Sequence, residues 1–204
     1  MTTLSENFFN RVPAATGRWL GTLLLTLWLG APWAHALKPQ DKFTLADLEA
    51  EPTMTPGEFA SLFAFFTFEY RPFLQGPEVF LRNRSGDCDD YAVLADHLLR
   101  RHNYKTRLIR VELVGTNVRH VVCYVTEKKA YLDYNNRRYF LTLERSSPSL
   151  RSIANKVADS FEKNWTSVSE FKYNYGDTRQ QIVWTVLKTD PPSRDPDRLA
   201  ANAN

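Results

Sequence analysis

The sequence is poor in cysteine: it has only Cys88 and Cys123, and it lacks a close-spaced pair of the CxxC type. Structural zinc sites usually draw on such a pair, so a zinc centre made by Cys88, His120 and Asp133 is disfavoured. An excess of one charge is also lacking, with 26 basic residues against 23 acidic ones. The basic pairs do not join into a stripe with interleaved aromatics, so we expect no nucleic-acid partner.

A hydrophobic run long enough to cross a membrane is absent as well. The most apolar segment, residues 19–29, is shorter than the ~20 residues that a spanning helix needs. Two arginines precede it, and the small residues Ala34 and Ala36 follow it, which is typical of a secretory signal. We therefore predict a signal peptide at residues 1–36 and a periplasmic or secreted protein with no membrane association after cleavage. The alternative is an uncleaved N-terminal segment that anchors the chain.

Removing this leader changes the charge balance little, because it holds only two arginines and one glutamate. The mature chain keeps 24 basic and 22 acidic residues, a net charge of +2. Its length is enough for one domain with a substantial core and too short for two. We predict a lead-in strap at residues 37–54, a domain at residues 55–188 and a disordered tail at residues 189–204.

Helical patterns come first in the mature chain. A capping box at residues 55–58, with proline at the first helical position, predicts a buried helix that runs to about residue 69. Asp87 is placed as the N-cap of a second helix at residues 88–102. A third helix begins at residues 147–148 and carries apolar residues at helical spacing.

Alternating apolar and polar residues then predict strands. They cover residues 106–114, a hairpin of 117–125 and 129–133, residues 137–144, and residues 167–175 with 180–188 around a turn at 176–177. Helices first and antiparallel strands after them define an α+β domain.

Cys88 stands among three aspartates in the segment SGDCDDYA. Neighbouring carboxylates oppose formation of a thiolate, because an anion beside an anion costs free energy. The position in the first turn of a helix acts the other way, since free N–H groups and the helix dipole favour an anion. Cys88 is therefore an inert thiol, a nucleophile, or one half of a disulfide with Cys123, the ordinary expectation in an exported protein.

One histidine of the mature chain is placed to act as a base for Cys88. His97 points to the opposite side of its helix, and His102 lies ~21 Å along the helix axis. His120 remains, on the first strand of the predicted hairpin. If His120 faces Cys88, strand alternation turns Cys123 away from that thiol, so the disulfide and the Cys–His pair are alternatives.

A carboxylate for the imidazole comes from the second strand of the hairpin. With a four-residue loop, Asp133 falls on the same face as His120, diagonal to it and about 7 Å away, while Asn135 falls directly opposite and competes for the orienting role. A thiol, an imidazole and a carboxylate in this order are the parts of nucleophilic acyl transfer. Candidate oxyanion donors are the backbone N–H of Cys88 and the side chains of Tyr70 and Gln75.

The segments GDCDDYA, RHVVCYV and YLDYNN, in that order, resemble the transglutaminase-like superfamily of papain-type folds. More narrowly, they resemble its bacterial transglutaminase-like cysteine peptidases. The resemblance covers roughly residues 60–145, and GDCDDYA is its most specific part. It implies a papain-like core, in which N-terminal helices pack on an antiparallel sheet and the nucleophile begins a helix. It also implies Cys88 as nucleophile, His120 as base and Asp133 as the third member of a triad.

Some exported members of this group cut surface adhesins and bind calcium through acidic residues that flank the cysteine. Asp87, Asp89 and Asp90 match that acidic pattern, although Asp89 stands where those members usually carry glutamate. Carboxylate oxygens favour Ca²⁺, and a bound cation would reverse the field around the thiol. The simpler alternative is that Asp87 caps the helix and the other two complement its dipole.

We therefore predict an exported cysteine hydrolase that cleaves a peptide or isopeptide bond through a thioester acyl-enzyme. Its expected partner is a protein or peptide substrate, such as a cell-surface protein, and the chemistry itself requires no cofactor. Two alternatives stay open: a transamidase, in which an amine resolves the acyl-enzyme, and a non-catalytic papain-like module that binds peptide or cell-wall material.

Overall fold

The computed structural model describes residues 37–38, 41–115, 119–136, 143–176 and 179–189. The predicted signal peptide lies outside these residues, and so does the predicted tail after residue 189. Part of one predicted strand, residues 137–142, and Asp177 of the predicted turn also lie outside them. Within the described part of the chain, no helix is both long and apolar enough to cross a membrane.

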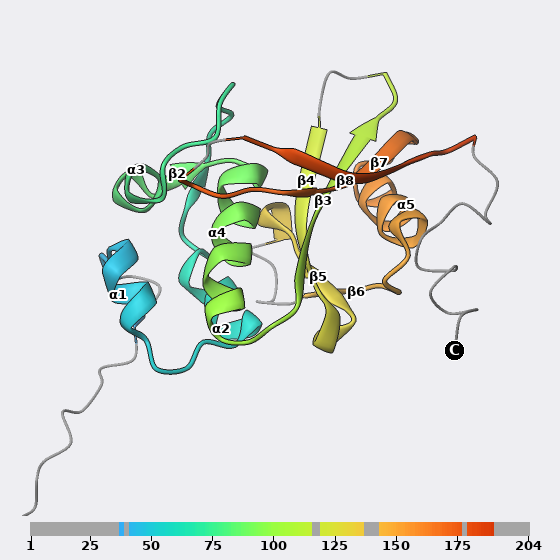
Figure 1. The fold of residues 1–204 in the computed structure, drawn as a ribbon. Coiled ribbons are helices and arrows are strands. Elements are labelled where there is room, and N and C mark those ends of the chain that lie inside the picture. Colours follow the sequence, from blue (N-terminus) through green and yellow to red (C-terminus); the bar gives the residue numbers. More distant parts are fainter. Residues whose placement is uncertain (1–36, 39–40, 116–118, 137–142, 177–178, 190–204) are drawn as a thin grey trace, which may run out of the picture. The chain divides into compact units, whose positions relative to one another are not determined.

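Six strands of the described chain form one antiparallel sheet in the order β6-β5-β4-β3-β7-β8 (Figure 1). Their bounds are β3 Thr106–Leu113, β4 Arg119–Val125, β5 Ala130–Leu132, β6 Glu144–Arg145, β7 Trp165–Lys172 and β8 Gln181–Leu187. Helices precede this sheet and interrupt it, so the predicted α+β class is confirmed.

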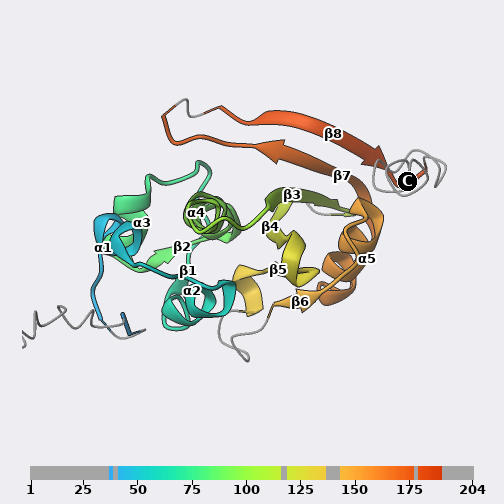
Figure 2. The ribbon, with the colours of Figure 1, turned by 60° about the horizontal axis from the view of Figure 1, so that its bottom comes forward.

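Each face of the sheet carries its own hydrophobic core. Helix α4 (Cys88–Arg101) packs on one face together with α2 (Pro56–Leu62), and α5 (Leu150–Ser160) covers the other (Figure 2). Successive residues of a strand point to opposite faces, so Cys123 of β4 joins the α4 side while Val122 joins the α5 side. Helix α4 is thereby held against β4, the strand that carries His120.

The two elements that carry the predicted site agree with the sequence pattern. Helix α4 begins at Cys88 with Asp87 as its N-cap, and Asp90 completes a capping box. Strands β4 and β5 are joined by four residues, and Val125 pairs with Ala130 in the predicted register.

Helix α2 starts as predicted but ends earlier. Its capping box and its proline at the first helical position are both present. The helix ends at Leu62 instead of near residue 69, because the chain turns to form β1 (Thr67–Phe68), which pairs in parallel with β2 (Ser85–Gly86). Phe66 remains buried although it is no longer helical.

Two short helices were not predicted. Helix α1 (Leu45–Ala50) lies within the predicted strap and has a capping box of its own, formed by Thr44 and Asp47. Helix α3 (Pro77–Asn83) begins directly after Gly76. Both contact α4. Helices this short are marginal by themselves, so tertiary packing stabilises them more than their sequence period does.

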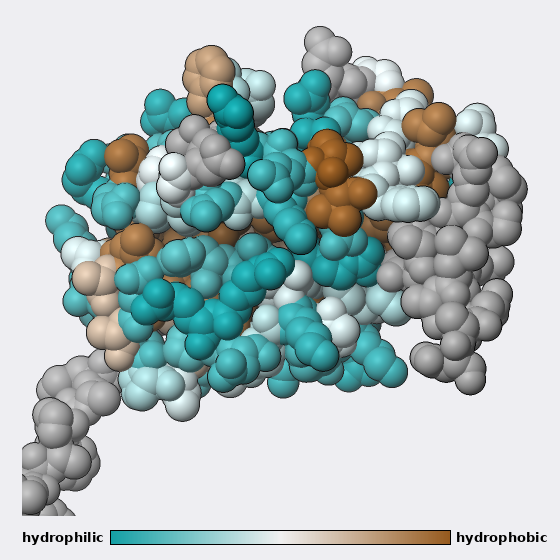
Figure 3. Space-filling view, in the orientation of Figure 1, coloured by the Kyte–Doolittle hydropathy of each residue, from teal (hydrophilic) through white to brown (hydrophobic). Residues whose placement is uncertain are grey.

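The edge strand β8 exposes apolar side chains. Figure 3 shows hydrophobic residues gathered over this strand on a face that is otherwise largely hydrophilic. The exposed residues are Ile182, Val183, Trp184 and Leu187. An uncovered apolar edge of this kind can pair with another chain.

Candidate active site

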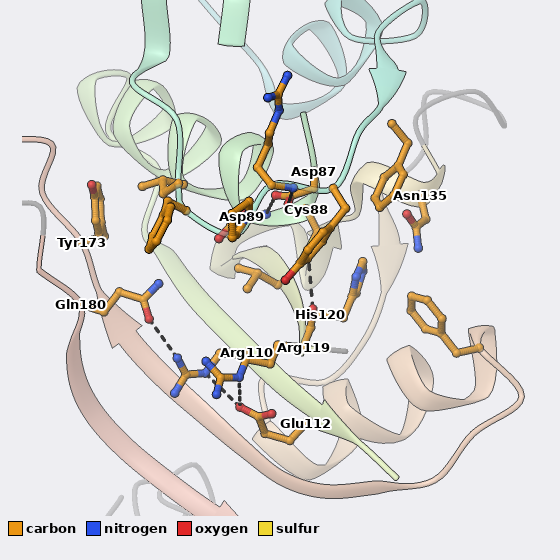
Figure 4. Close-up of a pocket in the computed structure, with 18 residues that line it drawn as sticks. Asp87, Cys88, Asp89, Arg110, Glu112, Arg119, His120, Asn135, Tyr173 and Gln180 are labelled. Atoms are coloured by element: carbon orange, nitrogen blue, oxygen red, sulfur yellow. Dashed lines mark hydrogen bonds and ion pairs between the residues drawn. The ribbon is translucent and has the colours of Figure 1, made fainter. Parts of the chain in front are cut away.

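Cys88 and His120 meet where the N-terminus of α4 lies against the start of β4. Cys88 is half-buried, and its Sγ lies 3.8 Å from the carbonyl oxygen of Arg119. His120 is 2% exposed, and the nearby Cys88 thiol helps to raise the pKa of its imidazole. The structure therefore brings together the predicted thiol and the predicted base (Figure 4).

Asp133 lies beside His120, on the face that the hairpin register predicts. Nε2 of His120 is 2.9 Å from Oδ1 of Asp133, and the carboxylate is almost fully buried. The same oxygen accepts a hydrogen bond of 2.8 Å from the backbone N–H of Asn135. Strand β5 ends before Asn135, which lies in a 3₁₀ turn, so this residue holds Asp133 and does not pair with His120 across the hairpin.

The surroundings of His120 favour its protonated form. Burial by itself lowers the pKa of His120, but the charge and hydrogen bond of Asp133, together with the contact with Cys88, outweigh burial and raise the pKa to about 10. Because Asp133 engages Nε2, the nitrogen available to Cys88 is Nδ1. An imidazolium at this position stabilises a thiolate electrostatically.

Both cysteines are free, but the expected orientation of Cys123 is wrong. Cys123 does not turn away from the helix that carries Cys88: it is fully buried in the core beneath α4. Burial, and then the nearby charge of Asp96, raise its pKa. Asp96 lies roughly 12 Å further along α4 than Cys88. The two thiols are therefore kept apart by distance along the helix and not by facing opposite sides of β4.

The other two described histidines lie away from Cys88, as expected. Nε2 of His97 is 2.8 Å from Oε1 of Glu49, which lies in α1. His102 is the C-cap at the far end of α4.

Three carboxylates surround the first turn of α4, and one oxygen of each lies within 4.8 Å of the others. Asp87 accepts hydrogen bonds from the backbone N–H groups of Arg71 and Asp89, and Asp90 accepts two from Gln75. Oδ1 of Asp89 is buried and has no hydrogen-bond partner among the described residues. Burial, and then the hydrogen bond and charge of Asp87, raise the pKa of Asp89 to about 8. Oδ1 of Asp89 is thus a buried oxygen without a donor.

The two side chains considered as oxyanion donors are placed differently. Tyr70 lines the cleft above Cys88 and is 75% exposed. The side-chain amide of Gln75 donates to Oδ2 of Asp90 at 2.7 Å and to the carbonyl oxygen of Ser85 at 3.1 Å. Gln75 is therefore engaged in holding the acidic turn, and Tyr70 is the member of this pair that faces the cleft.

Cys88 and His120 line an open cleft of about 1180 Å³ (Figure 4). One wall is the aromatic-rich segment at residues 68–74. The opposite wall carries Arg110, Glu112 and Arg119 from β3 and β4, and Gln180 from the segment before β8. This geometry admits an extended chain between two walls of different chemistry.

Sequence reasoning missed several of these lining residues. Phe161, the C-cap of α5, packs its ring edge-on against His120 with centroids 4.8 Å apart. In the sequence it is one more apolar position of a helical pattern. Arg110 and Arg119 belong to different strands, and only the β3–β4 register brings them to one wall.

Residues 50–145 match a family model described as a transglutaminase-like domain, and this segment contains Cys88, His120 and Asp133. The part of the chain that carries the candidate site is therefore similar to transglutaminase-like domains. No curated protein matched the sequence.

Two solved structures of LapG from Legionella pneumophila are similar to the chain, each 14% identical with a TM-score of 0.40. The alignment with the EGTA-treated structure covers 63% of this chain and 70% of that one, and the alignment with the calcium-bound structure covers 73% and 78%.

Proposed function

We propose that the protein is a cysteine hydrolase that cleaves a peptide or isopeptide bond, with Cys88 as nucleophile, His120 as acid–base group and Asp133 as orienting carboxylate. The observation that carries this proposal is the hydrogen bond between buried His120 and Asp133 beside the Cys88 thiol, in an open cleft that Cys88 and His120 line. The match of residues 50–145 to a transglutaminase-like domain supports it.

In the proposed reaction, the Cys88 thiolate attacks the carbonyl carbon of the scissile bond. The C–N bond breaks as the His120 imidazolium gives its proton to the departing amine, and a thioester acyl-enzyme remains. Water then gives a proton to the neutral imidazole and attacks the thioester carbon. The carboxylic acid leaves, and the thiolate and imidazolium are restored.

Two neighbours support these steps. Asp133 holds the Nε2 side of His120, which directs Nδ1 to the thiol and stabilises the imidazolium. The N–H groups in the first turn of a helix have no intrahelical partner, so the backbone N–H of Cys88 is suited to bind the oxyanion. The hydroxyl of Tyr70 is the proposed second donor, since Tyr70 lines the cleft.

We further propose that Asp87, Asp89 and Asp90 hold a calcium ion. The chemistry of the donor set fits, because the three residues offer hard oxygen ligands within 4.8 Å of one another and Oδ1 of Asp89 is a buried oxygen without a donor. A bound cation would add positive charge beside Cys88. Calorimetric titration of the protein with Ca²⁺ tests this, and an absence of heat in wild type and in Asp89→Asn alike contradicts it.

The catalytic proposal is tested by incubating the folded mature protein with a complex peptide mixture and sequencing the new termini by mass spectrometry. We expect cleavage by the wild type and none by Cys88→Ala or His120→Ala. Adding a primary amine separates the two acyl-transfer outcomes, because hydrolysis yields a free acid and transamidation yields an amide of higher mass. A reactive Cys88 thiol with neither product would favour a binding module.

We also propose that the protein acts in the periplasm or outside the cell on a surface protein. The sequence pattern of residues 1–36 supports export. Terminal sequencing of the protein from the native host should give Leu37 as the first residue, whereas an intact N-terminus in the membrane fraction would favour the anchored alternative.

A further inference from the structure

One face of the sheet is covered by α4 over part of its length and is open to the cleft beyond the N-terminus of this helix. The helix covers this face over Leu108 and Cys123, where the core is apolar. Beyond the first turn of α4 the same face continues uncovered as the cleft wall, and there it carries charged side chains. They are Arg110 and Glu112 of β3 and Arg119 of β4.

This wall has an excess of positive charge. Nε of Arg110 and Nε of Arg119 both lie 3.4 Å from the same Oε1 of Glu112. One carboxylate therefore serves two guanidinium groups, and a single positive charge is left over.

The two arginines are not equivalent. Arg110 is 20% exposed, and its Nη1 donates to Oε1 of Gln180 at 2.9 Å, so its guanidinium is held in place. Arg119 has a side chain that is 66% exposed, and among the described residues Glu112 is its one polar partner. Most of the five donors of the Arg119 guanidinium are therefore free to bind a ligand.

Arg119 is also adjacent to the reacting atoms. It precedes His120 in the chain, and its carbonyl oxygen is 3.8 Å from Sγ of Cys88. A guanidinium can bind a carboxylate through two parallel hydrogen bonds.

We propose that Arg119 determines substrate specificity by binding an aspartate or glutamate side chain close to the scissile bond. This inference rests on the proposed cysteine hydrolase function and defines its substrate as an acidic polypeptide segment. The arginine wall attracts the carboxylate, which favours one direction of the substrate in the cleft. The aromatic wall at residues 68–74 receives apolar side chains on the other side.

Two assays test this proposal. In the first, wild type, Arg119→Gln, Arg119→Lys and Arg119→Glu are incubated with one peptide mixture, and residues around the cleaved bonds are counted by mass spectrometry. We expect a roughly three- to tenfold preference for Asp or Glu over Asn or Gln in the wild type, in keeping with a partly exposed charge pair. The preference should weaken in Arg119→Lys, vanish in Arg119→Gln and turn towards Lys or Arg in Arg119→Glu.

A matched control reverses a charge elsewhere. Lys156 is exposed on α5 and does not line the cleft, so Lys156→Glu should keep the wild-type preference. Raising the salt concentration should weaken the preference of the wild type, since salt screens an exposed ion pair. A merely structural role of Arg119 would change the total rate without changing the ratio of acidic to amide residues.

The second assay measures binding and needs no turnover. The ligands are short alanine-rich peptides in which one Phe is fixed and one Glu is moved through the remaining positions, together with the same peptides carrying Gln in place of Glu. Each peptide is titrated into Cys88→Ala and into Cys88→Ala/Arg119→Gln. If Cys88→Ala prefers Glu peptides and the double variant does not, the proposal for Arg119 is supported. This holds even if cleavage is never seen, because missing cleavage contradicts only the hydrolase function. Equal binding of Glu and Gln peptides, or cleavage without acidic preference in the wild type, overturns the role of Arg119 and leaves the hydrolase intact.

Discussion

His120 and Asp133 form a hydrogen-bonded pair at 2.9 Å in which both side chains are almost completely removed from solvent. A buried charge is costly unless it is paired, so each member makes the charged state of the other favourable. The pair is thus expected to act as a unit in both the chemistry and the stability of the protein.

Asp133→Asn should uncouple this pair while conserving its shape. Without the carboxylate, burial again lowers the pKa of His120, which should fall from about 10 towards or below the ordinary value near 6.5. The hydrolysis rate should drop by roughly 10²- to 10⁴-fold. NMR titration of the imidazole and steady-state kinetics measure the two effects. Asp96→Asn makes the same change in a carboxylate that bonds Thr106 and Arg100, and it should leave the His120 titration unchanged.

The same pair makes stability depend on alkaline pH. The folded pKa of His120 is raised above its unfolded value, so the folded state binds this proton more tightly. The stabilisation is fully present below about pH 6.5 and is lost as the pH rises through about 10, at up to ~1.4 kcal/mol per pH unit. Urea unfolding of wild type and His120→Gln across this range should give a difference in free energy that shrinks with rising pH. A constant difference would contradict the assigned pKa.

Asp89 should destabilise the calcium-free protein. The pKa of Asp89 is raised to about 8 in the folded state, so the folded protein binds this proton more tightly than the unfolded chain does. The contribution of Asp89 to the free energy of unfolding is therefore least unfavourable at acid pH and becomes more unfavourable as the pH rises from about 4 to about 8. In EGTA at pH 8, Asp89→Asn should raise the free energy of unfolding by on the order of 1 to 3 kcal/mol. The difference should disappear near pH 4. Added Ca²⁺ should stabilise the wild type and not the variant, and equal responses would count against the proposed calcium site.

Local signals predicted the parts of the site that lie within single elements or across one hairpin. Asp87 as N-cap placed Cys88, and the four-residue loop placed Asp133 beside His120, because caps and hairpin registers are set by neighbouring residues. The wall formed by Arg110 and Arg119 depends on the pairing of β3 with β4, and the contact of Phe161 depends on where α5 docks. Neither is encoded in a short segment.

The position of Cys123 illustrates the same limit. Strand alternation correctly separates it from His120, but the sequence does not reveal how far along α4 each strand residue lies. Both faces of β4 are buried. A residue of β4 can therefore face α4 without lying near Cys88.

The two thiols should differ sharply in reactivity. Cys88 is half-buried beside an imidazolium and opens to the cleft, whereas Cys123 is fully buried and its pKa is raised by burial and by Asp96. Brief treatment of the folded protein with iodoacetamide at pH 7 should label Cys88 alone, as read by mass spectrometry. His120→Ala should slow that labelling, and Cys123→Ala should leave it unchanged. Labelling only after addition of a reductant would mean that a disulfide forms in solution.

Gly86 is the last residue of β2 and directly precedes Asp87, the N-cap of α4. The space that a side chain would occupy at Gly86 is filled by neighbours of the acidic first turn of this helix. A Cβ at Gly86 would overlap the carboxylate of Asp90, the ring of Phe80 at 2.7 Å and the amide of Gln75 at 2.8 Å. Gly86→Ala should therefore push the Gln75–Asp90 contact apart and lower the free energy of unfolding by roughly 1 to 3 kcal/mol. Because Asp90 completes the capping box of α4, the shift should also displace Cys88 and slow its alkylation.

Gly57→Ala provides the control for this last change. Gly57 lies in α2 and nothing is within 4 Å of the added Cβ, so the substitution should be neutral or should stabilise the helix by about 0.5 to 1 kcal/mol. Thermal unfolding and alkylation kinetics of both variants separate the effect of crowding from the general effect of replacing a glycine. If Gly86→Ala behaved like Gly57→Ala, the packing around Asp90 would not be what positions the first turn of α4.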